Sequence, residues 1–150
     1  MNFNYQSLQG ELVESVQSWT EKSFDSKLEQ LTQFVRIPSL AWPGVDRQPL
    51  LDSAEKIRSL FESTEIFETV EIVESAANGT PAIIAKRSAK PGFPQVLLYA
   101  HHDIQPVGDL EQWTTEPFEP TIKGDRLFGR GASDDKAGVI THLAACEMLR

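Results

Sequence analysis

The chain has 150 residues, of which 40% are hydrophobic and 24% charged, a composition typical of a globular domain and too apolar for a disordered one. Twenty-two acidic against fourteen basic residues give a formal net charge of −8, which disfavours nucleic acid and anionic membranes as partners. The single cysteine, Cys146, excludes an internal disulfide and a cysteine-rich zinc site, and no signal peptide is recognisable, so a cytoplasmic location is expected.

Apolar side chains at helical spacing predict three helices in the first part of the chain. Two of them cover residues 8–19 and 28–35. The spacing of Ser26 and Glu29 predicts a capping box at the start of the second helix, because these side chains can satisfy exposed backbone donors there. A third helix is predicted over residues 49–61, with a proline in its first turn.

The periodicity then changes to that of strands. Residues 67–73 and 81–86 predict two strands joined by a turn at Asn78 and Gly79. Residues 95–100 form a short, continuously apolar run bounded by turn signals, which is typical of a strand buried on both faces of a sheet.

The last third of the chain predicts a short strand at residues 126–128 and a helix that begins near Lys136. Alternating helices and strands predict an α/β fold. The helical pattern reaches Arg150 without a glycine or proline stop signal. This indicates a truncated chain, with a small complete domain as the alternative.

The first candidate site is the segment Tyr-Ala-His-His-Asp at residues 99–103, which follows the predicted buried strand. Open α/β sheets bind ligands at this end of their strands. Residues two apart in an extended chain point the same way, so His101 and Asp103 are expected to project together and His102 elsewhere. Imidazole is a good zinc ligand whose second nitrogen a carboxylate often holds. A lone His-x-Asp triplet is a weak signal, and by itself it favours the alternative of solvated loop residues.

The second candidate site is the segment Gly-Arg-Gly-Ala-Ser-Asp-Asp-Lys at residues 129–136, which places acidic side chains at the start of a helix. Helix capping by Asp134 or Asp135 would need no function and is the alternative. The spacings of a phosphate-binding loop and of a serine nucleophile elbow are both absent.

Three segments together closely resemble one zinc metallopeptidase family. They are residues 99–108 (Tyr-Ala-His-His-Asp-Ile-Gln-Pro-Val-Gly), 113–118 (Trp-Thr-Thr-Glu-Pro-Phe) and 125–136 (Asp-Arg-Leu-Phe-Gly-Arg-Gly-Ala-Ser-Asp-Asp-Lys). The family includes carnosine dipeptidase, bacterial dipeptidases, aminoacylase, acetylornithine deacetylase and succinyl-diaminopimelate desuccinylase. The resemblance implies that residues 1–150 are the amino-terminal portion of a catalytic domain with a mixed sheet flanked by helices. The rest of that domain and an inserted dimerisation domain are then expected beyond Arg150.

The resemblance also implies roles for individual residues. His101 would ligate one zinc ion, Asp134 would bridge two, and Asp103 would act as a catalytic residue that orients the imidazole of His101. The other ligands and the catalytic glutamate of the family are expected beyond Arg150. Glu147 lies too near Asp134 in the sequence to be one of them.

The chain departs from the family pattern at a few positions. Ala100 and Ala137 stand where the family commonly has glycine, and neither change removes a ligand. His102 occupies a position that is usually not histidine, which leaves open which imidazole binds, although the family pattern favours His101. His142 lies in the last helical stretch and is expected to be an ordinary surface or packed residue.

The implied activity is hydrolysis of the amide bond of dipeptides or short peptides by a centre of two zinc ions, with Mn²⁺ or Co²⁺ as alternative metals. Residues 103–106 and 113–118 look most like the dipeptidase branch. Deacylation of N-acyl amino acids is the alternative activity, and a non-catalytic metal-binding module is the alternative class. The implied partners are a small peptide substrate and a second copy of the chain, bound through the inserted domain. Residues 1–150 alone are expected to be inactive.

Overall fold

The computed structural model describes residues 5–74, 76 and 79–150. Its elements in chain order are α1 (Tyr5–Val35), α2 (Gln48–Glu62), β1 (Thr69–Glu74), β2 (Pro81–Lys86), η1 (Leu110–Gln112), β3 (Thr121–Lys123), β4 (Arg126–Phe128), η2 (Ala132–Lys136) and α3 (Ala137–Met148). In the described part of the chain, no helix combines the length and the apolar character needed to cross a membrane.

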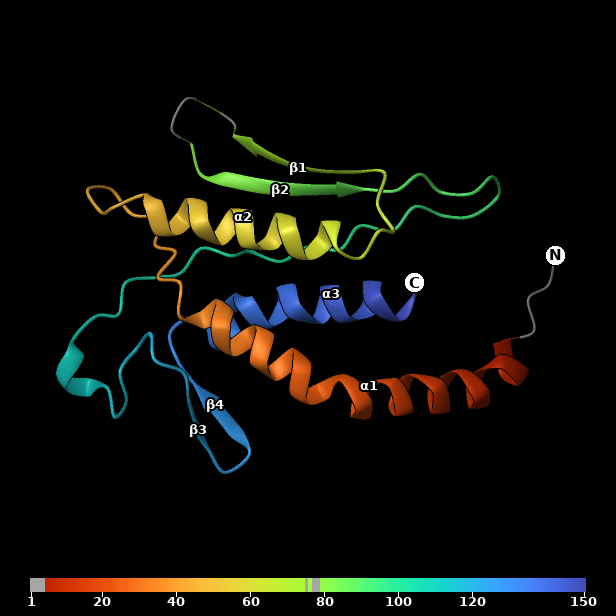
Figure 1. Ribbon diagram of the computed structural model, residues 1–150, viewed down its shortest axis with the longest axis horizontal. Coiled ribbons are helices and arrows are strands. Elements are labelled where there is room, and N and C mark those ends of the chain that lie inside the picture. The colour runs from red at the N-terminus through yellow and green to blue at the C-terminus, as the bar shows by residue number, and fades with distance from the viewer. Residues whose placement is uncertain (1–4, 75, 77–78) are drawn as a thin grey trace.

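Helix α1 is one continuous element of 31 residues, so the expectation of two helices was wrong. Ser26 and Glu29 lie inside α1 and form no capping box, because no glycine or proline interrupts the chain between the two apolar patterns. Ser23 fits into this helix by donating a hydrogen bond to the carbonyl of Trp19, 2.8 Å away. The amino-terminal part of α1 reaches past the end of α3 (Figure 1), and the apolar side chains of Leu12 and Val13 on α1 are exposed.

The third predicted helix and the first two predicted strands are confirmed. Helix α2 carries a proline in its first turn, as expected. Strands β1 and β2 pair antiparallel, with Thr69 opposite Lys86, and α2 packs against this hairpin. Of the predicted turn, Asn78 lies outside the described residues.

The carboxyl-terminal third also follows the sequence pattern. The strand predicted at residues 126–128 is β4, which pairs antiparallel with β3 in a second, separate hairpin. The helix predicted after Lys136 is α3. Within the described residues, the expected mixed sheet is therefore represented by two antiparallel hairpins of two strands each.

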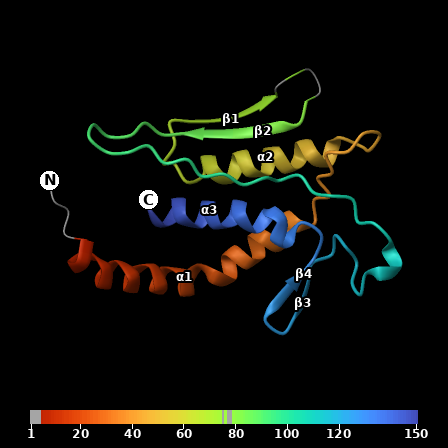
Figure 2. The same ribbon diagram turned by 180° about the vertical axis from the view of Figure 1, so that it is seen from behind.

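The predicted buried strand at residues 95–100 is wrong for the described part of the chain. This segment belongs to no strand, and the side chains of Val96, Leu97 and Tyr99 are 73%, 89% and 77% exposed. It runs as an extended chain between α2 and α3 in both views (Figures 1 and 2). A continuously apolar sequence favours burial on two faces, but burial requires neighbouring strands, and no described strand pairs with this segment.

The hydrophobic core lies where the three helices meet. One buried cluster joins the end of α1, α2 and α3, and it consists of Phe34, Ile57, Val139, Ile140 and Leu143. Ala100 packs against this cluster. The core therefore fixes the segment that precedes His101 at one point, Ala100, while the residues before it remain exposed.

Candidate metal centre

Residues 101–104 are held in place by the loop that follows α1. Ser39 is fully buried, and its hydroxyl donates a hydrogen bond to the carbonyl of His102 over 2.6 Å. The amide of Ile104 donates to the carbonyl of Ser39 over 3.0 Å, and Leu40 pairs with Ile104 in a parallel bridge. These contacts keep residues 101–104 extended, so successive side chains point to opposite sides.

His101 and Asp134 meet at the surface although they are 33 positions apart. The imidazole Nε2 of His101 lies 2.9 Å from Oδ1 of Asp134. The side chain of His101 is 36% exposed and that of Asp134 is 83% exposed, so solvent and solutes can reach both groups. The sequence predicted that these two side chains lie together, and their role as metal ligands stays a prediction.

Asp103 contacts the other nitrogen of the same ring. Nδ1 of His101 lies 3.1 Å from the main-chain carbonyl oxygen of Asp103 and 3.4 Å from its carboxylate Oδ1. Burial lowers the pKa of His101, but the Asp103 carbonyl and the carboxylates of Asp134 and Asp103 outweigh it, so the pKa is raised overall. Asp103 thus fixes the ring orientation through its main chain first and its carboxylate second.

His102 points away from this cluster into the protein and is only 7% exposed. Its Nδ1 lies 2.9 Å from the hydroxyl of Ser53 on α2, and its Nε2 lies 3.0 Å from the carbonyl oxygen of Pro81 on β2. A carbonyl only accepts, so Nε2 carries the proton and Nδ1 accepts from Ser53. Burial lowers the pKa of His102. Both nitrogens are engaged in the neutral ring, which makes His102 a structural residue.

The loop that carries Asp134 depends on close packing around Gly131. Gly131 has a φ of +79°, and a Cβ atom there would lie 2.4 Å from Cγ2 of Ile104. The amide of Lys136 donates to the carbonyl of Gly131 over 3.1 Å and closes the turn. Inside it, Asp134 adopts a non-helical φ of −124° and ψ of 93°. Helix capping by Asp134 or Asp135 is not observed, since Lys136 is the N-cap residue of α3 and no side chain caps this helix.

Lys136 anchors the same loop to the end of α1, a role that the sequence did not predict. Its side chain is fully buried, and Nζ donates to the carbonyl oxygens of Phe34 and Ile37 over 2.9 and 2.5 Å. Nζ also lies 4.7 Å from the centre of the Phe34 ring. Burial lowers the pKa of Lys136 to about 7, whereas the carbonyls at a helix carboxyl terminus favour the charged ammonium.

The donor atoms present fit part of a zinc site. Zinc binds imidazole nitrogen at about 2.0–2.1 Å and carboxylate oxygen at about 2.0–2.2 Å, so two tetrahedral ligands of one ion stand roughly 3.3 Å apart. The 2.9 Å contact between His101 and Asp134 is close to that spacing. Among the described residues, however, no group of three or more His, Cys, Asp or Glu side chains could hold a metal ion.

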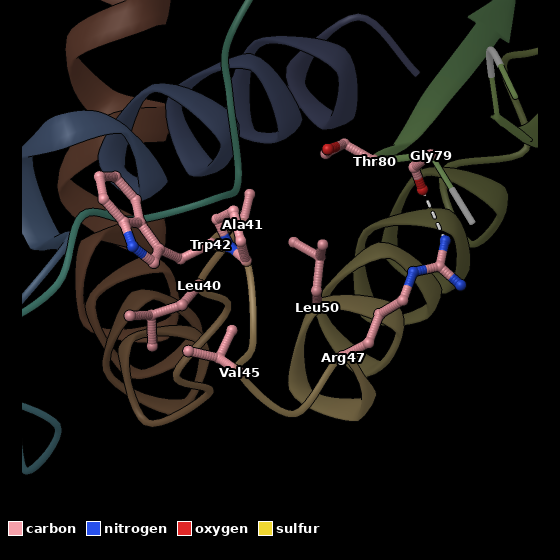
Figure 3. Close-up of a pocket in the computed structure, with 9 residues that line it drawn as sticks. Leu40, Ala41, Trp42, Val45, Arg47, Leu50, Gly79 and Thr80 are labelled. Carbon is pink, nitrogen blue, oxygen red and sulfur yellow. Dashed lines mark hydrogen bonds between the residues drawn. The ribbon is translucent and has the colours of Figure 1, made fainter.

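Other candidate features of the chain lie outside this cluster. A pocket of about 280 Å³ is bounded by the loop after α1, the start of α2 and the residues before β2 (Figure 3). Its one charged lining residue, Arg47, binds Glu74 and the carbonyl of Gly79, so the pocket offers no metal ligand. His142 is half-buried on α3, and Glu147 pairs with Lys27.

Comparison with known proteins supports the family resemblance and the fold class. Residues 97–150 match the profile of peptidase family M20/M25/M40, which confirms the resemblance recognised in the sequence motifs. A Cys-Gly metallodipeptidase of Schizosaccharomyces pombe is 31% identical over 135 residues, which cover 85% of this chain and 28% of the relative. A succinyl-diaminopimelate desuccinylase of Aromatoleum aromaticum is 46% identical over 57 residues, which cover 37% of this chain and 15% of the relative.

Solved structures confirm the α/β fold class. Human carnosine dipeptidase 1 has a TM-score of 0.82 at 25% identity over 91% of this chain, and the dipeptidase Dug1p of Saccharomyces cerevisiae has a TM-score of 0.79 at 22% identity over the same share. The chain covers 30% of each of these structures. It therefore spans less than a third of the length of each of these two proteins.

Proposed function

We propose that this chain contributes His101 and Asp134 to a centre of two zinc ions that hydrolyses the amide bond of dipeptides or short peptides. The observation that carries the proposal is the 2.9 Å contact between the imidazole Nε2 and the Asp134 carboxylate at the solvent-exposed end of residues 95–101. The similarity to a Cys-Gly metallodipeptidase over 85% of the chain supports the peptidase class and the choice of substrate. By the same similarity, residues 1–150 would be the amino-terminal portion of the catalytic domain.

The residues of this chain would prepare the site in three ways. Asp103 accepts the Nδ1 proton of His101, so loss of the Nε2 proton, which Asp134 accepts in the metal-free protein, would leave the Nε2 lone pair available to a zinc ion. Asp134 exposes 83% of its side chain, so its carboxylate would be accessible to metal ions from solvent. Zinc bound there would supply Lewis-acid polarisation of the scissile carbonyl and a bound water of lowered pKa. Asp134 would offset part of the positive charge.

The test uses the protein with its complete chain. We expect about two zinc ions per active site, hydrolysis of Cys-Gly that a chelator abolishes, and recovery on adding Zn²⁺. Carnosine and N-succinyl-diaminopimelate serve as competing substrates, because relatives of both kinds match this chain. Preferred cleavage of the succinylated substrate would favour the deacylase alternative. A metal-loaded protein that cleaves none of these compounds would favour a binding module.

Residues 1–150 by themselves are expected to show no turnover. A catalytic zinc ion generally uses three protein ligands, and the described residues bring only one imidazole and one carboxylate into contact for this purpose. Assaying this segment beside the complete protein with added Zn²⁺ checks the expectation. Comparable chelator-sensitive rates from both would contradict it.

A further inference from the structure

We propose that Asp135 is a positioning residue that fixes the main chain of His101, an inference that rests on the proposed function of that histidine. Oδ2 of Asp135 accepts a hydrogen bond from the backbone amide of His101 over 3.2 Å, although the two residues are 34 positions apart. Asp134 thus contacts the ring of His101, and Asp135 contacts its backbone. Two successive carboxylates hold one histidine from two directions.

Other contacts hold the main chain on either side of His101: Ala100 packs against the core, and Ser39 bonds the main chain of His102 and Ile104. No described strand pairs with residues 95–100, so no strand ladder of the described residues reaches the His101 amide itself. The contacts of Nδ1 and Nε2 determine where the ring points only when the main chain is held as well. The Asp135 carboxylate supplies an acceptor for the His101 amide at that position.

Gly138 provides the space that this carboxylate occupies. A Cβ atom at Gly138 would lie 2.3 Å from Oδ1 and 2.8 Å from Cγ of Asp135, distances at which one group must move. Any larger residue at position 138 would therefore displace the Asp135 side chain, which is the group bonded to His101. The position of the Asp135 carboxylate, and with it the hydrogen bond to the His101 amide, thus depends on the absence of a side chain at Gly138.

The experiment compares four variants of the complete protein. Asp135→Ala removes the acceptor, Asp135→Asn keeps an acceptor oxygen of the same shape, and Gly138→Ala displaces the carboxylate by contact. Ser133→Ala is the matched control, because Ser133 is exposed on the same loop. Alanine favours helix over glycine by about 1 kcal/mol, so a defect in Gly138→Ala cannot come from a weakened α3.

Two measurements on each folded variant test the proposal. The first is hydrogen exchange of the His101 amide in the metal-free protein, which we expect to accelerate in Asp135→Ala and Gly138→Ala and to stay near wild type in Asp135→Asn. The second is the dissociation constant for Zn²⁺, measured by competition with a chromophoric chelator. Loss of an outer-shell partner typically weakens metal affinity about 10–100-fold, and we expect that loss in the same two variants.

The outcomes separate this inference from the proposed function. Unchanged exchange of the His101 amide in Asp135→Ala would overturn the inference, as would Asp135→Asn behaving like Asp135→Ala in both measurements. If Asp135→Ala does not fold, Gly138→Ala carries the same test. The proposed function would be overturned if the wild-type protein binds no Zn²⁺. If the variants still show the expected changes in exchange, the role of Asp135 in fixing the His101 main chain would be retained.

Discussion

The two adjacent histidines of this chain occupy opposite environments. His101 is 36% exposed and contacts carboxylates on both sides of its ring, whereas His102 is 7% exposed and bonds a hydroxyl and a carbonyl. The cause is the alternation of side chains along residues 101–104, which the bridge to Leu40 keeps extended. One residue therefore serves a surface site while its neighbour joins α2, β2 and the loop after α1. We therefore expect substitutions of His101 to affect the proposed metal centre and substitutions of His102 to affect stability.

The largest expected effect that tests this comparison is that of His101→Ala on metal binding. Removing the only imidazole of the proposed centre in this part of the chain should abolish one zinc site and nearly all activity of the complete protein. The free energy of unfolding should change by less than about 0.5 kcal/mol in the metal-free state, because exposed sites contribute little. Zinc content, hydrolysis of Cys-Gly and urea denaturation measure the three quantities. Glu71→Gln, a change at an exposed position of β1, is the control.

His102→Ala should show the opposite profile. Deleting the ring leaves the Ser53 hydroxyl and the Pro81 carbonyl without their partner, and an unsatisfied buried group costs about 1–3 kcal/mol. We therefore expect a loss of roughly 2–6 kcal/mol in the free energy of unfolding, since two such groups are affected. Metal affinity of the folded fraction should stay close to that of wild type. A variant that keeps its stability and loses its zinc would reverse the assignment of the two histidines.

Ser53→Ala is a smaller perturbation of the same buried cluster. It removes the hydroxyl that donates to Nδ1 of His102 and leaves that nitrogen without a donor, so we expect a loss of about 1 kcal/mol. Ser53→Cys, which keeps a weak donor of similar size, should recover part of it. Thermal and urea unfolding of the two variants give the comparison. Equal stability of Ser53→Ala and wild type would show that His102 is held by Pro81 alone.

The pH dependence of stability should distinguish the histidines by sign. In the metal-free protein the pKa of His101 is raised, so its stabilisation is complete below the unfolded value of 6.5 and is lost as pH rises through the folded pKa. The pKa of His102 is lowered, so its contribution is present above 6.5 and is lost as pH falls through the folded pKa. NMR titration should place the two pKa values on opposite sides of 6.5. His101→Gln and His102→Gln should then change the slope of stability against pH in opposite directions, each by at most about 1.4 kcal/mol per pH unit.

The sequence alone determined the local elements and the composition of the site. Helix α2, the two hairpin strands β1 and β2, strand β4 and helix α3 all follow the periodicity of the sequence. Helix α2 buries one face, and β1 begins with alternating exposed and half-buried side chains. The proximity of His101 and Asp134 followed from two motifs that resemble one peptidase family. Each motif is short and contiguous, so the sequence alone shows all of its residues.

Only the tertiary structure decided how those elements are held together. The roles of Asp135 and Lys136 depend on partners 34 to 102 positions away, the His101 amide and the Phe34 carbonyl, which no local pattern encodes. The interruption expected in α1 did not occur. Ser26 and Glu29 lie inside the helix, where the backbone amides that they could cap are already bonded to carbonyls of the preceding turn. Residues 95–100 also differ from the sequence prediction, because residues 95–99 are exposed and the segment belongs to no described strand. Their apolar sequence favours burial, but burial depends on neighbours that the periodicity of one segment cannot supply.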